Sequence, residues 1–191
     1  MKRSLRRVLF ALLAVVIVIV GSTWGYRAFQ KAVFPLKYEE YVTKYAAEYG
    51  LPPSLVYAVI HTESHFDPEA ESGAGAKGLM QLVDGTYEWV QTLLPGEPEP
   101  PERVYDPEVN IRCGCKVLQV VMEQFEVKET ALAAYNAGSG NVAKWLKDPD
   151  YSNDGVTLKE IPFEETRNYV KRVLKAQELY QTMYNTDGED L

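Results

Sequence analysis

The chain has 191 residues, of which 46% are hydrophobic and 25% charged, so a globular domain with an appendage is expected rather than a disordered polymer. Its formal net charge is −7, yet the first 26 residues hold four basic and no acidic side chains, which leaves 16 basic and 27 acidic residues elsewhere. This acidic body argues against nucleic acid as a partner, because phosphate binding needs clustered lysine and arginine.

The N-terminus combines a basic segment with a long apolar run. Residues 8–20 are all apolar, and residues 8–25 would form about 27 Å of helix, close to the thickness of membrane hydrocarbon. The basic residues precede the run, which predicts a cytoplasmic N-terminus. We therefore expect an uncleaved single-pass anchor in the cytoplasmic membrane, with the body on the extracytoplasmic side. A cleaved signal peptide is the competing interpretation, although no Ala-x-Ala site directly follows the run.

Seven further helices are predicted from apolar residues at helical spacing, prolines in first turns and glycines after last turns. They span residues 36–49, 52–65, 86–93, 108–125, 129–137, 141–146 and 164–184. Residues 147–160 are turn-rich and compatible with a small hairpin. The predicted architecture is mainly α, with loops that can form the walls of a cleft.

Two cysteines, Cys113 and Cys115, lie two positions apart in the predicted helix 108–125. Side chains at this spacing point about 200° apart around a helix and cannot form a relaxed disulfide. We expect two small buried side chains. A metal site would need more ligands, and the sequence shows none nearby.

The stretch His-Thr-Glu-Ser-His at 61–65 has three interpretations. His61 and His65 share a helix face, as zinc ligands do, but Glu63 lies about 200° around the helix from each and the chain has no other histidine. We therefore expect no metal and no cofactor. Glu63 ends an apolar stripe, where it could pair with a buried arginine or cap a backbone group. Alternatively, a carboxyl in a partly apolar cleft has a raised pKa and can donate a proton near neutral pH.

Four motifs follow one another along the chain. They are Glu-Ser at 63–64, GAGAKGLMQL at 73–82, AAYNAGSGNV at 133–142 and IPFEETRNYVKRV at 161–173. This order resembles the lytic transglycosylase (SLT) family of the lysozyme-like superfamily, over about residues 38–179. Each motif alone is weak, but four in the right order are specific. One departure is Val83-Asp84, where the family often has Met-Pro, and this puts one wall of the cleft in doubt.

The resemblance implies a lysozyme-like helical domain with a substrate cleft, acting on peptidoglycan. It implies cleavage of the β-1,4 bond between N-acetylmuramic acid and N-acetylglucosamine, with formation of 1,6-anhydromuramoyl ends. Glu63 would be the single catalytic acid and base. The residues implied in binding the glycan strand are Ser72, Met80, Gln81, Tyr135, Asn136 and Glu165. A lysozyme-type muramidase and a non-catalytic wall-binding protein are the alternative functions.

Four of these binding residues have a structural alternative, and Asn136 could instead hold the turn in which it lies. Met80 could serve core packing, and Tyr135 could be a buried aromatic residue at a helix end. Glu165 could pair with Arg167 or Lys171 on a solvated face. The organisation we expect is a cytoplasmic segment at 1–7, a transmembrane anchor at 8–25, a linker at 26–37, an SLT domain at 38–180 and an acidic tail at 181–191. Residues 185–191 of this tail are expected to be frayed.

Overall fold

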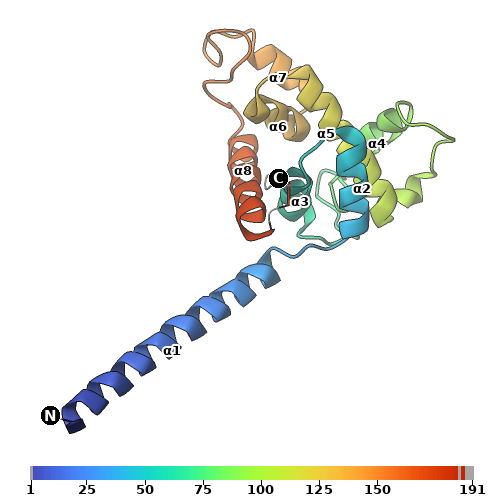
Figure 1. Cartoon of the computed structure of the whole chain (residues 1–191). Coiled ribbons are helices and arrows are strands. Elements are labelled where there is room, and N and C mark those ends of the chain that lie inside the picture. The colour runs from blue at the N-terminus through green and yellow to red at the C-terminus, as the bar shows by residue number, and fades with distance from the viewer. Residues whose placement is uncertain (1, 185, 188–191) are drawn as a thin grey trace. The chain divides into compact units, whose positions relative to one another are not determined.

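The computed structural model describes residues 2–184, 186 and 187, and it leaves the side chains of residues 1–12 and 14 undescribed. The chain divides into two compact units, Met1–Leu36 and Lys37–Leu191. The first unit contains one helix, α1 at Lys2–Val33 (Figure 1). The second unit contains the remaining elements and the cavity considered below.

Helix α1 continues to Val33, well past the predicted start of the linker at residue 26. Residues 27–33 contain neither glycine nor proline, and Pro35 follows the helix end, where it disfavours further helix. Leu13 and residues 15–20 are between 48% and 69% exposed. The predicted span also includes residues 8–12 and 14, whose side chains lie outside the described part. Among the helices as described, none has both the length and the apolar character required to cross a membrane.

The second unit is helical, and its β-pairing within the described residues is confined to isolated bridges such as Ser152 with Leu158. The mainly α prediction is confirmed. In this unit, the first and last residues of each predicted helix lie within about three positions of those observed. The elements are α2 (Glu39–Tyr49), α3 (Pro53–Ser64), α4 (Asp84–Gln91), the 3-10 helix η1 (Pro101–Tyr105), α5 (Pro107–Gln124), α6 (Lys128–Ala137), α7 (Ser139–Trp145) and α8 (Glu164–Tyr184).

Helix α3 is the central element of this unit (Figure 1). It packs against α2 and α8, while α5 packs against α2, α4 and α6. Residues 55–60 of α3 are each at most 2% exposed. The sequence suggested one apolar stripe, but the helix is buried all round because neighbours cover its other faces. Only its C-terminal end, which carries Glu63, reaches the cavity.

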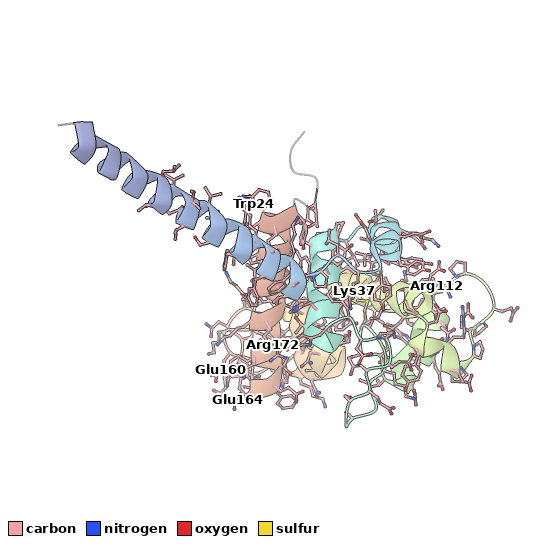
Figure 2. All side chains as sticks on the ribbon, turned by 90° about the horizontal axis from the view of Figure 1, so that it is seen from below. Trp24, Lys37, Arg112, Glu160, Glu164 and Arg172 are labelled. Carbon is pink, nitrogen blue, oxygen red and sulfur yellow. The ribbon has the colours of Figure 1, made fainter. Side chains whose placement is uncertain are left out.

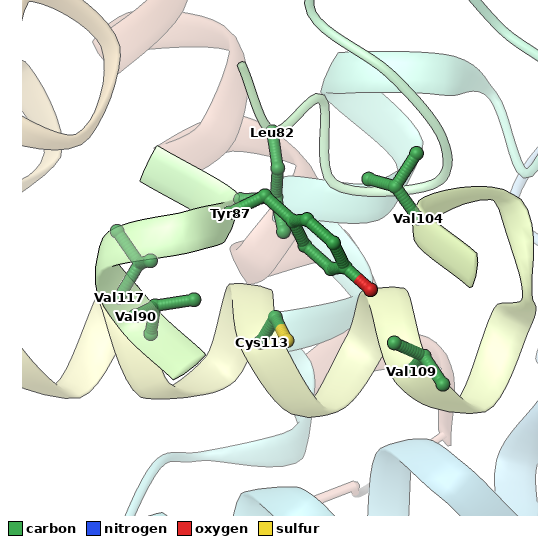
Figure 3. Close-up of a cluster of buried hydrophobic side chains, with 7 residues drawn as sticks. All are labelled: Leu82, Tyr87, Val90, Val104, Val109, Cys113 and Val117. Carbon is green, nitrogen blue, oxygen red and sulfur yellow. The ribbon is translucent and has the colours of Figure 1, made fainter. Parts of the chain in front are cut away.

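A cluster of buried apolar side chains joins α4, η1 and α5 beside the cavity (Figure 3). Its members are Leu82, Tyr87, Val90, Val104, Val109, Cys113 and Val117. Burying each large side chain stabilises the fold by about 1.5–3 kcal/mol. Cys113 and Cys115 are both buried and free, which confirms the prediction from their spacing.

The C-terminal segment is attached to the domain, contrary to the expectation of a frayed tail. The Asp187 carboxylate accepts hydrogen bonds from the backbone N–H of Ser54 at 2.9 Å, its hydroxyl at 2.7 Å and the side-chain amide of Gln181 at 2.8 Å. Ser54 lies in the first turn of α3, where a carboxylate satisfies a free N–H and complements the helix dipole. Residues 185 and 188–191 of the predicted tail lie outside the described residues.

Candidate active site

A cavity of about 410 Å³ lies within the second unit. It is lined from α3, the glycine-rich segment 72–82, and helices α4, α5, α6 and α8. Glu63 and five of the six predicted binding residues lie around it, namely Ser72, Gln81, Tyr135, Asn136 and Glu165. The fold therefore brings together residues that are as far apart in the sequence as Glu63 and Glu165. The lining also includes Val83, where the sequence departs from the family pattern, and Thr86 and Val117, which sequence motifs did not indicate.

Glu63 is placed by the end of α3. The Ser64 hydroxyl donates to the carbonyls of Ile60 at 3.2 Å and Leu79 at 2.8 Å, which fixes the helix end to the glycine-rich segment. The chain then turns away through two left-handed residues, His65 with φ of 52° and Phe66 with φ of 65°. The Glu63 carboxyl is only partly exposed, and its burial raises its pKa from 4.5 to about 7.

Three side chains of α8 modify the pKa of Glu63. Interaction with the Tyr169 hydroxyl and the positive charge of Arg172 lower this pKa, while the negative charge of Glu165 raises it. Glu165, Tyr169 and Arg172 are spaced i, i+4 and i+7, so they share one face of the helix. Figure 2 shows Arg172 extending from α8. That spacing could have drawn attention to Tyr169 and Arg172, which were predicted only as helix positions.

The Tyr169 hydroxyl has unsatisfied hydrogen-bonding capacity. The residue is 1% exposed, and among the described residues its hydroxyl makes no well-formed hydrogen bond, although it lies close enough to Glu63 to affect its pKa. An unpaired buried hydroxyl costs about 1–3 kcal/mol.

Tyr135 and Met80 are linked through the backbone. The Tyr135 hydroxyl donates a 2.9 Å hydrogen bond to the Met80 carbonyl. Met80 was expected to line the cleft, but its side chain is fully buried and is not among the lining groups. It packs directly over Gly114, where any added Cβ would overlap the Met80 side chain. The packing alternative therefore describes the Met80 side chain, and Met80 takes part in the bonds around the site through its backbone.

The glycine-rich segment is held by Asn110 of α5, which the motifs did not identify. Asn110 is 0% exposed, and its side-chain oxygen accepts from the N–H of Met80 at 2.7 Å. Its amide nitrogen donates to the carbonyls of Lys77 at 3.1 Å and Val104 at 2.7 Å. Gly78 has a φ of 74°, and a Cβ there would overlap the Asn110 amide. The segment thus depends on a glycine to approach this asparagine.

Gln81 adopts a conformation that is uncommon for its residue type. Its φ is 50°, and its side-chain amide donates to the carbonyls of Ala70 at 3.1 Å and Gly78 at 3.0 Å. Left-handed non-glycine residues cost of order 1 kcal/mol or more and cluster at functional sites. Ser72 is exposed at the same cavity, and its hydroxyl accepts from the N–H of Ala76 at 3.0 Å.

Helices α6 and α8 meet at the cavity through Asn136. The Thr166 hydroxyl donates to the side-chain oxygen of Asn136 at 2.8 Å. The neighbouring Glu165 is exposed and lines the cavity, while Arg167 contacts Glu160 at 3.8 Å. Hydroxyl, amide and carboxyl groups therefore surround one carboxyl that titrates near neutrality. Such a site can exchange a proton with a neutral, hydroxyl-rich substrate.

Comparisons with known proteins show the family to which the chain is related. The family model described as "Transglycosylase SLT domain" matches residues 40–155, and that of the "Soluble lytic transglycosylase helical domain" matches residues 160–188. A soluble lytic murein transglycosylase of Escherichia coli (strain K12) is 37% identical over 173 residues, which cover 88% of this chain and 26% of that protein. A membrane-bound lytic murein transglycosylase C of Yersinia pestis (strain Pestoides F) is 32% identical over 168 residues, covering 76% and 47%.

Among solved structures, an inactive Glu-to-Gln mutant of the lytic transglycosylase Slt from Pseudomonas aeruginosa is similar to this chain. It superposes with a TM-score of 0.71 and 37% identity, covering 80% of this chain and 25% of that one. The chain therefore spans about a quarter of the length of the soluble relatives that it matches. The similarity concerns the helical domain that holds the cavity.

Proposed function

This chain belongs to the SLT transglycosylase family of the lysozyme-like superfamily, and on that premise we propose that it is a membrane-anchored peptidoglycan lytic transglycosylase. The observation that carries the proposal is the Glu63 carboxyl, which lines the cavity and has a pKa raised to about 7. About half of such groups are then protonated at neutral pH, as a general acid requires. The relatives named as lytic transglycosylases, one of them inactive as a Glu-to-Gln mutant, support the same conclusion.

In the first step, Glu63 donates its proton to the oxygen of the β-1,4 bond between N-acetylmuramic acid and N-acetylglucosamine. The bond from the muramoyl C1 to that oxygen breaks, and positive charge develops on the ring. The resulting Glu63 carboxylate is favoured by the positive charge of Arg172 and by interaction with Tyr169, both of which lower its pKa. A positioned acid contributes about 10²–10⁴-fold, and charge stabilisation supplies part of the remainder.

In the second step, the Glu63 carboxylate takes the proton from the muramoyl 6-hydroxyl, whose oxygen bonds to C1 and closes a 1,6-anhydro ring. The net proton transfer is from O6 to the departing oxygen, and no water is consumed. Glu63 regains its proton and is ready for another cycle. Ordinary glycosidases use two carboxylates instead. Attack by water in place of O6 would make the enzyme a muramidase of lysozyme type.

The strand would be held by groups from three sides of the cavity. We assign substrate binding to Ser72, Gln81, Tyr135, Asn136 and Glu165, which all line it. Met80 keeps an indirect role, because its carbonyl fixes the Tyr135 hydroxyl. Uncharged sugars suit hydroxyl and amide donors, which gain affinity only when their geometry is preorganised.

The test of this assignment is Glu63→Gln in the full chain, which keeps the shape of the side chain and removes its proton. Release of soluble fragments from purified peptidoglycan should fall at least about 10²-fold. Glu71→Gln is the matched control, since Glu71 is exposed and contacts Tyr105 at 3.2 Å without lining the cavity. Cleavage by the Glu63 variant at the wild-type rate would remove Glu63 from the mechanism.

The membrane part of the proposal rests on the N-terminal sequence and on α1. The apolar run at 8–20 follows four basic residues, and Leu13 and residues 15–20 are exposed on the helix. We expect the full chain in the membrane fraction, with residues 38–180 outside the cytoplasm. Val16→Arg with Val18→Arg should move it to the soluble fraction, because charges at mid-span are costly. Gln30→Arg, which lies beyond the span, should leave the chain in the membrane fraction. A wild-type chain found in the soluble fraction would contradict the proposed membrane anchor.

A further inference from the structure

Two exposed apolar side chains, one on α4 and one just after it, form what we call the apolar platform beside the cavity wall. Thr86 lines the cavity, and Trp89 and Leu93 follow it at three and seven residues. Thr86 and Trp89 lie in α4 and share one side of it, whereas Leu93 lies in the turn after the helix, which ends at Gln91. Trp89 is 45% exposed and Leu93 44% exposed. Trp89 therefore lies outside the cavity on the side of α4 that carries Thr86, and Leu93 is a second exposed apolar side chain just beyond the helix end.

The platform is held rigidly beside the cavity. The Trp89 carbonyl accepts hydrogen bonds from the N–H of Thr92 at 3.1 Å and its hydroxyl at 2.7 Å, and the N–H of Leu93 donates to Val90 at 3.0 Å. Val90, the next residue after Trp89, is fully buried in the cluster that contains Val117 (Figure 3). Val117 itself lines the cavity, so the C-terminal half of α4 remains next to its wall.

We propose that Trp89 and Leu93 form a distal glycan subsite, which contacts sugar rings of the same strand that lie beyond the cavity. This inference rests on the proposed function, because it assumes that the cavity binds a polysaccharide. A polymer must leave the cavity along one of its walls, and this wall continues directly into an aromatic surface. One face of a pyranose ring presents C–H groups, and an exposed indole offers a broad apolar surface for it with little conformational entropy to lose.

The subsite makes a length-dependent prediction. Short ligands occupy the cavity alone, whereas long ligands also reach the platform. Removal of the indole should therefore weaken the binding of long oligosaccharides and leave short ones unchanged. A residue that only stabilised the fold would affect both lengths equally.

The experiment measures Kd by calorimetry for β-1,4-linked N-acetylglucosamine trimers and hexamers, using the full chain in detergent with Glu63→Gln as background. Trp89→Ala should weaken hexamer binding about tenfold and trimer binding less than about twofold. Trp89→Phe should retain most of the hexamer affinity. Glu88→Ala, a change at the adjacent exposed position on another side of α4, should leave both affinities unchanged.

Three results would overturn the inference: an unchanged hexamer affinity in Trp89→Ala, an equal loss for both lengths, or no hexamer binding by the chain with Trp89 intact. Self-association that Trp89→Ala abolishes, with hexamer affinity unchanged, would assign the platform to a second copy of the chain. The cleavage assay on Glu63→Gln separates the two proposals. An inactive Glu63 variant with unchanged hexamer binding in Trp89→Ala removes the subsite alone, whereas an active Glu63 variant removes the proposed catalytic role.

Discussion

The hydroxyl of Tyr135 donates a 2.9 Å hydrogen bond to the carbonyl of Met80, and this bond joins α6 to the glycine-rich segment at the cavity. On the other side of Met80, its N–H donates to the buried Asn110 at 2.7 Å. One residue whose side chain never reaches the cavity is thus held from both α5 and α6. The position of its neighbour Gln81, which does line the cavity, depends on both bonds.

Tyr135→Phe removes the hydroxyl and leaves the ring. We expect a loss of about 1 kcal/mol in the free energy of unfolding, together with at least a tenfold fall in turnover on peptidoglycan, because the segment that carries Gln81 loses its support. Tyr87→Phe is the matched control. Its hydroxyl donates to the carbonyl of Pro100 at 3.3 Å, a bond that contacts no predicted site residue. Equal activity losses in both variants would show that the Tyr135 bond has no special effect.

The pH dependence of cleavage should report the protonation of Glu63. Its acid form donates the proton, and burial raises its pKa from 4.5 to about 7. We therefore expect kcat/KM on purified peptidoglycan to be maintained up to about pH 6 and to fall as the pH rises through 7. A decline centred near 4.5, or a constant rate up to pH 9, would contradict the proposed acid.

Arg172→Gln should move that decline to higher pH. The positive charge of Arg172 lowers the pKa of Glu63, so its removal favours the protonated carboxyl. The expected displacement is about half a pH unit at low ionic strength, and smaller in salt because Arg172 is exposed. Lys171→Gln changes the same charge at the adjacent exposed position and should leave the profile in place. A displacement of similar size in both variants would indicate a general charge effect.

Glu63→Gln should also stabilise the domain, but only at neutral and higher pH. The folded-state pKa is raised, so the folded protein binds more protons than the unfolded chain between about pH 4.5 and 7. Wild-type stability therefore falls as the pH rises through this interval. A shift to about 7 corresponds to roughly 3 kcal/mol, and partial exposure reduces this to on the order of 1–2 kcal/mol. Urea unfolding should show that Glu63→Gln has a higher free energy of unfolding than the wild type at pH 8 and an equal one at pH 4. A gain at both pH values would contradict the raised pKa of Glu63.

Gly78→Ala should be more harmful than Gly75→Ala. Both glycines have positive φ, at 74° and 78°, so both substitutions introduce backbone strain of about 1 kcal/mol. Only at Gly78 would the new Cβ overlap the Asn110 amide and the Val104 carbonyl, whereas the space at Gly75 is open. We expect a loss of about 2–4 kcal/mol for Gly78→Ala in urea unfolding. Equal losses would show that backbone strain, and not contact with Asn110, requires the glycine.

Local patterns were sufficient to predict the helices of the second unit. Pro52 precedes α3 and Pro53 is its first residue, while Gly50 ends α2 with a φ of 64°. The η1 turn and the extension of α1 were not predicted, because a 3-10 turn of five residues is too short to show a helical period and the apolar run that indicated α1 ends at residue 20. The attachment of Asp187 to Ser54 joins positions 133 residues apart, which no local pattern can indicate.

The candidate site was predicted mainly through the family motifs, and the structure shows why residue patterns alone were insufficient. The apolar periodicity around Glu63 indicated a carboxyl at the end of a buried face but could not tell a cavity from a packed helix end. Met80 stands in a motif that lines the cavity, yet its side chain turns into the space over Gly114. Side-chain direction within an irregular loop depends on the helices around it.

The most direct test of the proposed function is the mass of the muramoyl ends that the full chain releases from purified peptidoglycan. Cleavage in which the 6-hydroxyl of the substrate replaces water predicts 1,6-anhydromuramoyl ends. Fragments heavier by one water, with reducing ends, would contradict a transglycosylase and indicate a lysozyme-type hydrolase.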